Sequence, residues 1–164
     1  MPSIRVSQRV ELSVRRLVLS IASVIGLSAS ALAGPGTDFS EFAADLREQA
    51  DERAVLAAST PAAPAQPLDI EDPFYFELEQ FSVDAMRLSR AIAQADGPQD
   101  LQCIFRGMSE DAADRLEALN EADSSGDQAR IYRNLSALLR DAEEIAPAVD
   151  DAGVELSGMS CSNG

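Results

Sequence analysis

The stretch DPFYFELEQFSVDAMRLSRAIAQADGP, residues 72–98, decides the fold class of this chain. Its apolar side chains recur at alternating spacings of four and three residues, which is the pattern of a helix that packs alongside other helices. Asp72 predicts the helix start, because its carboxylate can accept the free amides of the first turn, and Pro73 suits the first helical position. The apolar positions are Phe74, Leu78, Phe81, Ala85, Leu88, Ile92 and Ala95.

The end of this helix is predicted at Asp96-Gly97-Pro98, where Gly97 can adopt a left-handed stop and Pro98 can open the next helix. So short a connection indicates an antiparallel hairpin with a second helix over about Pro98–Ala122. The apolar stripe of that helix comprises Leu101, Phe105, Met108, Ala112, Leu116 and Leu119, with Ile104 alongside.

A turn signal at Asp123–Gly126 precedes a further helix, for which Ser125 and Gln128 have the spacing of a capping box. Pro147 is expected to bend or end this helix, and the tail Asp150–Gly164 is expected to be irregular. The stripe here comprises Ile131, Leu135, Leu138, Ala142, Ile145 and Val149.

An earlier helix is predicted over about Asp38–Ala58, with a looser apolar face. The following segment Ser59–Leu68 has three prolines in ten residues, which favours an extended, semi-rigid path. The sequence therefore predicts an all-α fold, an antiparallel three- to four-helix bundle that this helix either completes or leaves on its linker. The apolar face of the predicted helix at Asp38–Ala58 comprises Phe39, Phe42, Leu46 and Leu56.

Residues 1–33 are typical of a cleavable bacterial signal peptide. Four arginines precede an apolar run over Leu17–Ala33 that ends in Ala31-Leu32-Ala33, and small residues at these positions fit signal peptidase. Cleavage is expected between Ala33 and Gly34. The run includes four serines and is shorter than the roughly 20 apolar residues that span a bilayer. We expect an exported protein, periplasmic or secreted, whose mature chain has no stable membrane insertion.

The chain contains two cysteines, Cys103 and Cys161. Cys103 lies two positions from both Leu101 and Phe105, so its thiol is expected to point away from the apolar stripe. An even count in an exported chain predicts a disulfide between the two cysteines. Intermolecular disulfides and a redox-active pair are alternatives, although the second lacks the Cys-x-x-Cys spacing.

These observations predict four regions along the chain. They are a signal peptide at 1–33, an N-terminal amphipathic helix at 34–58, a Pro/Ala-rich linker at 59–72, and a helical bundle with a disulfide-tied tail at 73–164.

Composition excludes several classes of function. The chain has no His, and all 13 of its basic residues are arginines; beyond residue 33 it carries nine arginines and 27 acids, a formal charge of −18. That field repels nucleic acids and anionic membranes. Without His or Lys, neither an imidazole metal ligand nor a Ser–His–Asp triad nor a P-loop lysine can be built. We therefore assign no catalytic, cofactor-binding or metal-binding residue.

Three features keep other readings open. Carboxylates on the last two long helices are candidates for acid–base pairs, which would require burial. Asp123–Asp127 resembles a calcium loop, but Tyr132 stands where the closing Glu is needed. Tyr75 and Phe76 lie off the stripe, where they can cover a neighbouring helix or meet a partner. The carboxylates that are candidates for acid–base pairs are Glu110, Asp111, Asp114, Glu117, Glu121, Asp141, Glu143 and Glu144.

The function that these features favour is a non-enzymatic interaction or accessory module of the bacterial envelope. Its expected partner is a basic protein that contacts either the helix at Asp38–Ala58 or the Tyr75/Phe76 surface. The alternatives are a small carboxylate-dependent hydrolase or lyase, and a small-ligand or cation carrier.

Overall fold

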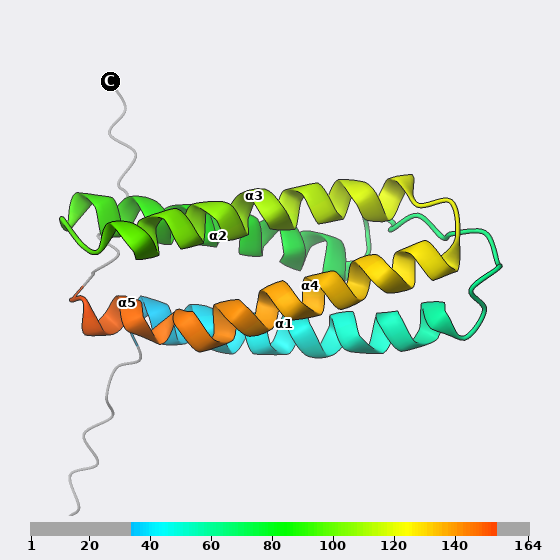
Figure 1. The fold of residues 1–164 in the computed structure, drawn as a ribbon, viewed down its shortest axis with the longest axis horizontal. Coiled ribbons are helices and arrows are strands. Elements are labelled where there is room, and N and C mark those ends of the chain that lie inside the picture. The colour runs from blue at the N-terminus through cyan, green and yellow to red at the C-terminus, as the bar shows by residue number, and fades with distance from the viewer. Residues whose placement is uncertain (1–33, 154–164) are drawn as a thin grey trace, which may run out of the picture. The chain divides into compact units, whose positions relative to one another are not determined.

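A computed structural model describes residues 34–153, so the predicted signal peptide and Cys161 lie outside the described residues. Successive long helices run in opposite directions (Figure 1). Over residues 34–153 there is no β-strand, only an isolated bridge between Pro64 and Ser124. The predicted all-α antiparallel bundle is thus confirmed. Its helices are α1 (Pro35–Ala58), α2 (Pro73–Gln94), α3 (Gln99–Glu121), α4 (Ser125–Ile145) and the short α5 (Pro147–Asp151).

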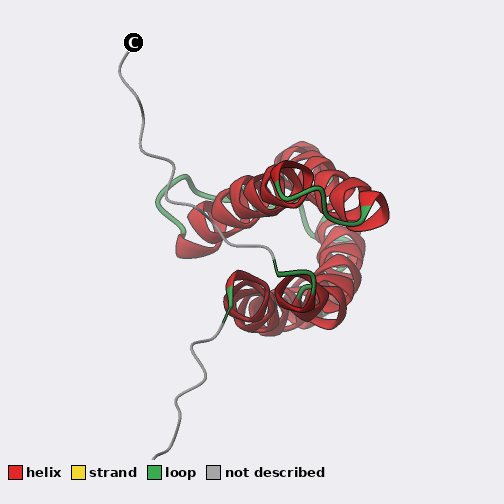
Figure 2. Ribbon diagram, turned by 90° about the vertical axis from the view of Figure 1, so that its left-hand side faces the viewer, coloured by secondary structure: helices red, strands yellow, loops and turns green. Residues whose placement is uncertain are grey.

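The bundle is built from two close antiparallel pairs. α1 packs along α4 and α2 packs along α3, while contacts between the two pairs are fewer (Figures 1 and 2). Small residues permit the close approach of α1 and α4: a Cβ at Gly36 would overlap the carbonyl oxygen of Ala146. The N-terminal helix therefore completes the bundle as its fourth member. Buried alanines on this pair are Ala43, Ala50, Ala54, Ala129 and Ala142.

Serine hydroxyls join α2 to α3. Ser82 Oγ donates to the carbonyl oxygen of Ser109 at 2.9 Å, and Ser89 Oγ donates to that of Gln102 at 2.8 Å. Both donors and both acceptors are seven residues apart, so the two bonds repeat once per two helical turns and fix the register of the pair. Because each hydroxyl finds a backbone acceptor, these serines can lie at a close helix contact.

Aromatic rings join one pair to the other. Phe39 of α1 stacks on Phe81 of α2 with ring centroids 4.9 Å apart, and it meets Phe105 of α3 edge-on at 5.9 Å. Phe74 of α2 meets Tyr132 of α4 edge-on at 5.9 Å. Rings of this size bury large apolar areas and contribute most to core energetics. Small residues thus set the spacing within each pair, whereas aromatic rings fill the space between pairs.

The linker at 59–72 is not extended throughout, because turns occur at 59–62 and at 70–71 and only residues 65–69 between them lack turns. It lies against the turn between α3 and α4 instead of standing apart. The buried amide of Gln128 accepts the N–H of Gln66 at 3.1 Å and donates to its carbonyl oxygen at 2.6 Å. Three backbone bonds continue the contact: Ala65 N–H to Asp123 O, Ser125 N–H to Ala63 O and Gly126 N–H to Pro61 O.

Two predicted helix ends are confirmed. The carboxylate of Asp72 accepts the Phe74 N–H at 2.9 Å, and Pro73 is the first residue of α2. α4 ends at Ile145 and α5 begins at Pro147. The predicted irregular tail starts later than expected, because Asp150 belongs to α5.

The predicted capping box is wrong by one residue. Ser124, not Ser125, caps α4 by accepting the Asp127 N–H at 3.2 Å. Gln128 is unavailable for a capping box because its amide binds Gln66.

The left-handed residue after α2 is Asp96, with a φ of 51°, and not Gly97. Gly97 is needed for a different reason. A Cβ there would lie 3.0 Å from Ile92 Cγ2 and 3.1 Å from the Ile92 carbonyl oxygen, which accepts the Gly97 N–H. The glycine therefore serves close approach, while the aspartate, which tolerates positive φ better than most residues, makes the turn.

Most of the predicted stripes are buried, with a few exceptions at their edges. Leu56 and Ala95 are exposed, and Ile104 is partly exposed, although the sequence places them on or beside apolar faces. The buried face of α1 turns away from Leu56 because alanines continue it. That face comprises Phe39, Ala43, Leu46, Ala50 and Ala54.

Candidate interaction groove

A groove of about 500 Å³ runs along the outer side of the α2–α3 pair. Leu78 and Leu116 are buried beneath it, whereas Val83 is 46% exposed within it. The accessible apolar surface between the two helices is therefore provided chiefly by Val83, above the buried leucines. We call this feature the α2–α3 groove; its lining is Tyr75, Leu78, Glu79, Ser82, Val83, Ala113, Leu116, Glu117 and Asn120.

The charged side chains of the α2–α3 groove are both acidic. Glu79 and Glu117 are exposed, and no arginine lines the groove. The pKa of the Tyr75 hydroxyl is raised, chiefly by the negative charge of Glu79 and further by partial desolvation and hydrogen bonding to that carboxylate. A raised tyrosine pKa beside a glutamate is the local sign of a negative potential. The groove therefore combines an apolar lining with an anionic rim.

An exposed aromatic ring extends the apolar surface beyond the groove. Phe76 is 55% exposed on α2 and lies seven residues before Val83, so the two side chains share one helix face. Tyr75 is half-buried and its ring contacts Phe76 edge-on at 5.9 Å. The Tyr75/Phe76 surface identified from the sequence is thus divided, with Tyr75 in the groove and Phe76 at its outer edge.

A second apolar patch lies at the C-terminal end of α1. Val55 and Leu56 are 72% and 70% exposed, beside Asp51 and Glu52. All four lining residues belong to one helix, so this patch lacks the second wall that the α2–α3 groove has.

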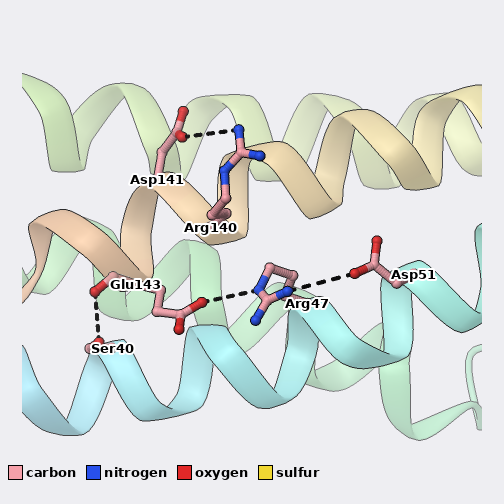
Figure 3. A network of polar contacts seen from close by, with 6 residues as sticks. All are labelled: Ser40, Arg47, Asp51, Arg140, Asp141 and Glu143. Carbon is pink, nitrogen blue, oxygen red and sulfur yellow. Dashed lines mark hydrogen bonds and ion pairs between the residues drawn. The ribbon is translucent and has the colours of Figure 1, made fainter.

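The candidate carboxylates of α3 and α4 lie on outer faces, except for Glu143. Glu143 accepts Arg47 Nε at 3.0 Å, and Arg47 also lies 3.7 Å from Asp51 (Figure 3). The carbonyl oxygen of Glu143 accepts the Ser40 hydroxyl at 2.7 Å. These contacts join α1 to α4 and give Glu143 a structural partner.

Asp150 is a polar anchor that sequence reasoning missed. Its carboxylate accepts the N–H groups of Gly36 and Thr37, each at 2.8 Å, and the Thr37 hydroxyl at 2.7 Å. Partial burial raises its pKa, but these hydrogen bonds outweigh burial and leave the pKa below the ordinary value. The contact joins residues more than 110 positions apart. The available signal was Gly34, an N-cap without a side chain, which implies that another residue caps α1.

The Asp123–Asp127 turn serves helix capping. Asp127 accepts the Ser124 hydroxyl at 2.7 Å and pairs with Arg130 at 2.7 Å. The Ser124 hydrogen bond, followed by that of Arg130, lowers the pKa of Asp127. Within residues 34–153 no group of three Cys, Asp or Glu side chains is placed to hold a metal ion.

Cys103 is exposed near the start of α3, as its position off the stripe predicts. Its expected partner Cys161 lies outside the described residues, so the disulfide remains a prediction. The predicted cleavage site at Ala33–Gly34 lies at the edge of the described part, in which α1 begins at Pro35.

No helix in the described part of the chain is both long and apolar enough to cross a bilayer. The chain matches no family model, no curated protein and no solved structure.

Proposed function

We propose that this chain is an exported, non-enzymatic interaction module that binds a basic polypeptide partner. The observation that carries the proposal is the α2–α3 groove, in which an apolar lining and the accessible Val83 side chain adjoin the carboxylates of Glu79 and Glu117. Surfaces that are apolar at the centre and charged at the rim are the usual anatomy of a protein–protein interface.

The acidic exterior supports the same proposal through its effect on encounter rates. Beyond residue 33 the formal charge is −18. Such a field attracts a basic partner over distances of about a Debye length, roughly 10 Å at 0.1 M salt, and speeds association more than it strengthens the final complex. Apolar contact in the groove then supplies the affinity that steering alone does not.

Export and cleavage after Ala33 complete the proposal, since they place the mature chain in the periplasm or the medium with Gly34 as its first residue. The N-terminal sequence of the protein recovered from the envelope or medium tests this part directly. A chain that retains residues 1–33 contradicts it.

The interaction itself is tested by affinity capture from an envelope extract on immobilised chain from Gly34 to Gly164. We expect a basic protein to be retained at about 50 mM salt and released at about 500 mM, because salt screens the steering field. An immobilised unrelated protein of similar net charge controls for ion exchange. Failure to retain any protein at low salt, beyond what the control retains, contradicts the proposed function.

A further inference from the structure

We infer that the α2–α3 groove is the docking site for a cationic amphipathic helix of the partner protein, with two Arg or Lys side chains one turn apart directed at Glu79 and Glu117. This inference rests on the proposed function and specifies its binding site. It names the surface, the secondary structure of the bound segment and the spacing of its charges.

The register of α2 against α3 sets the spacing of the two acceptors. Ser82 contacts Ser109, so Glu79, three residues earlier on α2, lies level with position 112 of the antiparallel α3. Glu117 is five residues further along α3, and at 1.5 Å per residue the backbone positions of the two glutamates are staggered by about 7.5 Å along the groove. Residues i and i+4 of a helix are about 6 Å apart along its axis, so two basic residues at that spacing match the stagger.

The carboxylates of the groove are available for such a partner. Among residues 34–153, six of the nine arginines pair with carboxylates elsewhere, and neither Glu79 nor Glu117 forms an ion pair. Two anions that form no ion pair, of which Glu79 is hydrogen-bonded to Tyr75, favour beside an apolar lining a ligand that carries cations next to apolar side chains. The long aliphatic stems of Arg and Lys can themselves cover apolar surface while their charged ends reach the rim.

The shape of the groove favours a helix as the occupant. Two antiparallel helices present parallel walls, and an amphipathic helix laid between them can bury its apolar face against Val83 and Ala113, the exposed apolar residues of the lining. The patch at Val55 and Leu56 is also acidic and apolar, but its lining comes from a single helix and offers no second wall.

A synthetic peptide provides the probe. It is an 18-residue, alanine-based helix with one Arg-x-x-x-Arg pair and leucines on the face between the arginines, labelled for fluorescence anisotropy with the chain from Gly34 to Gly164. One control peptide has the same composition with its arginines eleven residues apart, and another has Glu in place of Arg. We expect the first peptide to bind about threefold more tightly than the widely spaced one, which can form only one of the two ion pairs, and the Glu peptide not to bind.

Variants of the chain assign the contact. The double variant E79Q/E117Q is expected to weaken binding of the first peptide about tenfold, because it removes two ion pairs. V83S is expected to weaken binding about fivefold through lost apolar contact. The matched control E41Q/E144Q removes two exposed carboxylates on α1 and α4 and is expected to change affinity by less than about twofold. Circular dichroism melts verify that each variant folds.

Equal binding by E79Q/E117Q and E41Q/E144Q would overturn the groove assignment, as would equal binding of the two arginine spacings. Retention of the envelope partner by E79Q/E117Q at wild-type strength would also overturn it, while leaving the proposed function intact. Analytical sedimentation tests whether a second copy of the chain occupies the groove instead of a partner helix. A dimer that V83S dissociates would show this and would overturn the inference.

Discussion

Asp150 shows how one side chain can complete a helix distant in sequence. Gly34 is the N-cap of α1 but has no side chain to accept the first amides, and the Asp150 carboxylate accepts those of Gly36 and Thr37 instead. A Cβ at Gly34 would overlap this carboxylate, so glycine at the cap position and aspartate in α5 depend on each other. A negative charge at the start of a helix is further favoured by the helix dipole.

We predict that D150N lowers the free energy of unfolding at pH 7 by about 1 kcal/mol, because the amide keeps one acceptor oxygen but loses the second and the negative charge that the start of a helix favours. Because the folded pKa of Asp150 lies below its ordinary value of 3.8, its contribution is present above that value and is lost as the pH falls through the folded pKa. Urea unfolding at pH 7 should therefore separate wild type from D150N, and the gap should shrink towards pH 3. D151N, an exposed neighbour, is the control; an equal loss in D151N refutes the capping role.

Two helical glycines give predictions of opposite sign. A Cβ at Gly36 would overlap the Ala146 carbonyl oxygen, so G36A is expected to destabilise by at least about 1 kcal/mol. A Cβ at Gly107, inside α3, would meet nothing within 4 Å. G107A is therefore expected to stabilise by about 0.5–1 kcal/mol, because alanine is the better helix former. Thermal melts of G36A and G107A beside wild type measure both changes in Tm. A lower Tm for G107A would contradict this prediction.

At the scale of elements, Gln128 links the linker to the helices. Its buried amide holds both backbone groups of Gln66 and also donates to the Leu119 carbonyl oxygen at 3.3 Å. Asn120 adds a further bond by accepting the Leu68 N–H at 3.0 Å. A proline-rich segment has few amides to offer, so two amide side chains secure a large part of its contact with the bundle.

We predict that Q128A exposes the linker to proteolysis. Removing the amide takes away the hydrogen bonds to the N–H and carbonyl groups of Gln66, at a loss of about 0.5–1.5 kcal/mol for each bond. Cleavage by a nonspecific protease within residues 59–72 should become faster than in wild type. Q94A, which alters an exposed glutamine at the end of α2, should leave the rate unchanged; a linker equally resistant in Q128A would contradict the predicted role.

The helices that sequence predicts best are those whose faces carry large side chains. In α2, α3 and α4, leucine, isoleucine and phenylalanine occur almost only at core positions, so their periodicity reveals the buried face. In α1 the buried face is mostly alanine, which also occurs at exposed positions, and Leu56 falls on the solvent side. The pattern in α1 therefore indicated a helix but not its orientation, because Ala is compatible with either environment.

The α2–α3 groove could not be predicted from sequence for a related reason. Its lining comes from two helices whose relative rotation depends on the Ser82–Ser109 and Ser89–Gln102 contacts, and periodicity in a single helix contains no information about them. Tyr75 and Phe76 were recognised because large rings off an apolar stripe are conspicuous. Glu79 and Glu117 were not distinguished from the many other acids of the chain.

The net charge is a property of the whole molecule that opposes its folding. With a formal charge of −18 beyond residue 33, carboxylates repel one another more strongly in the compact state than in the unfolded chain. The arginine pairs offset little of this repulsion, because most of their side chains are substantially exposed, Arg53–Asp72 excepted, and exposed pairs contribute at most about 1 kcal/mol each.

We therefore predict that salt stabilises the protein. The Tm should rise between about 10 and 150 mM ionic strength and change less above it, because the Debye length falls from about 30 to 8 Å over that range. Sodium chloride and sodium sulfate at equal ionic strength should act alike at these concentrations. A Tm that falls with added chloride would show that the ion pairs outweigh the repulsion.

The predicted disulfide also belongs to the whole molecule, because it would join the two helix pairs at one end. Cys103 is exposed near the start of α3, and that end of α3 lies at the same end of the bundle as α5 (Figure 1). Cys161 lies eight positions after Gly153, and a chain of that length reaches at most about 27 Å, comparable with two helix diameters.

Mapping under non-reducing conditions tests this pairing: trypsin should release Ala91–Arg106 and Asp141–Gly164 as one linked species. The disulfide would close the loop from Cys103 to Cys161, about 59 residues long, and should stabilise the fold by up to about 4 kcal/mol. Reductant should therefore lower the stability of wild type. Without reductant, C103S should have the same stability as wild type in reductant. Adding reductant should not change the stability of C103S, because no intramolecular disulfide remains to be broken. Free thiols at both positions in protein purified from the envelope or medium would rule the bond out. The two pairs would then be held together without a covalent bond, by the aromatic contacts of Phe39 and Phe74, by the polar contacts of Gln49 and Arg53 with the start of α2, and by the connecting segments.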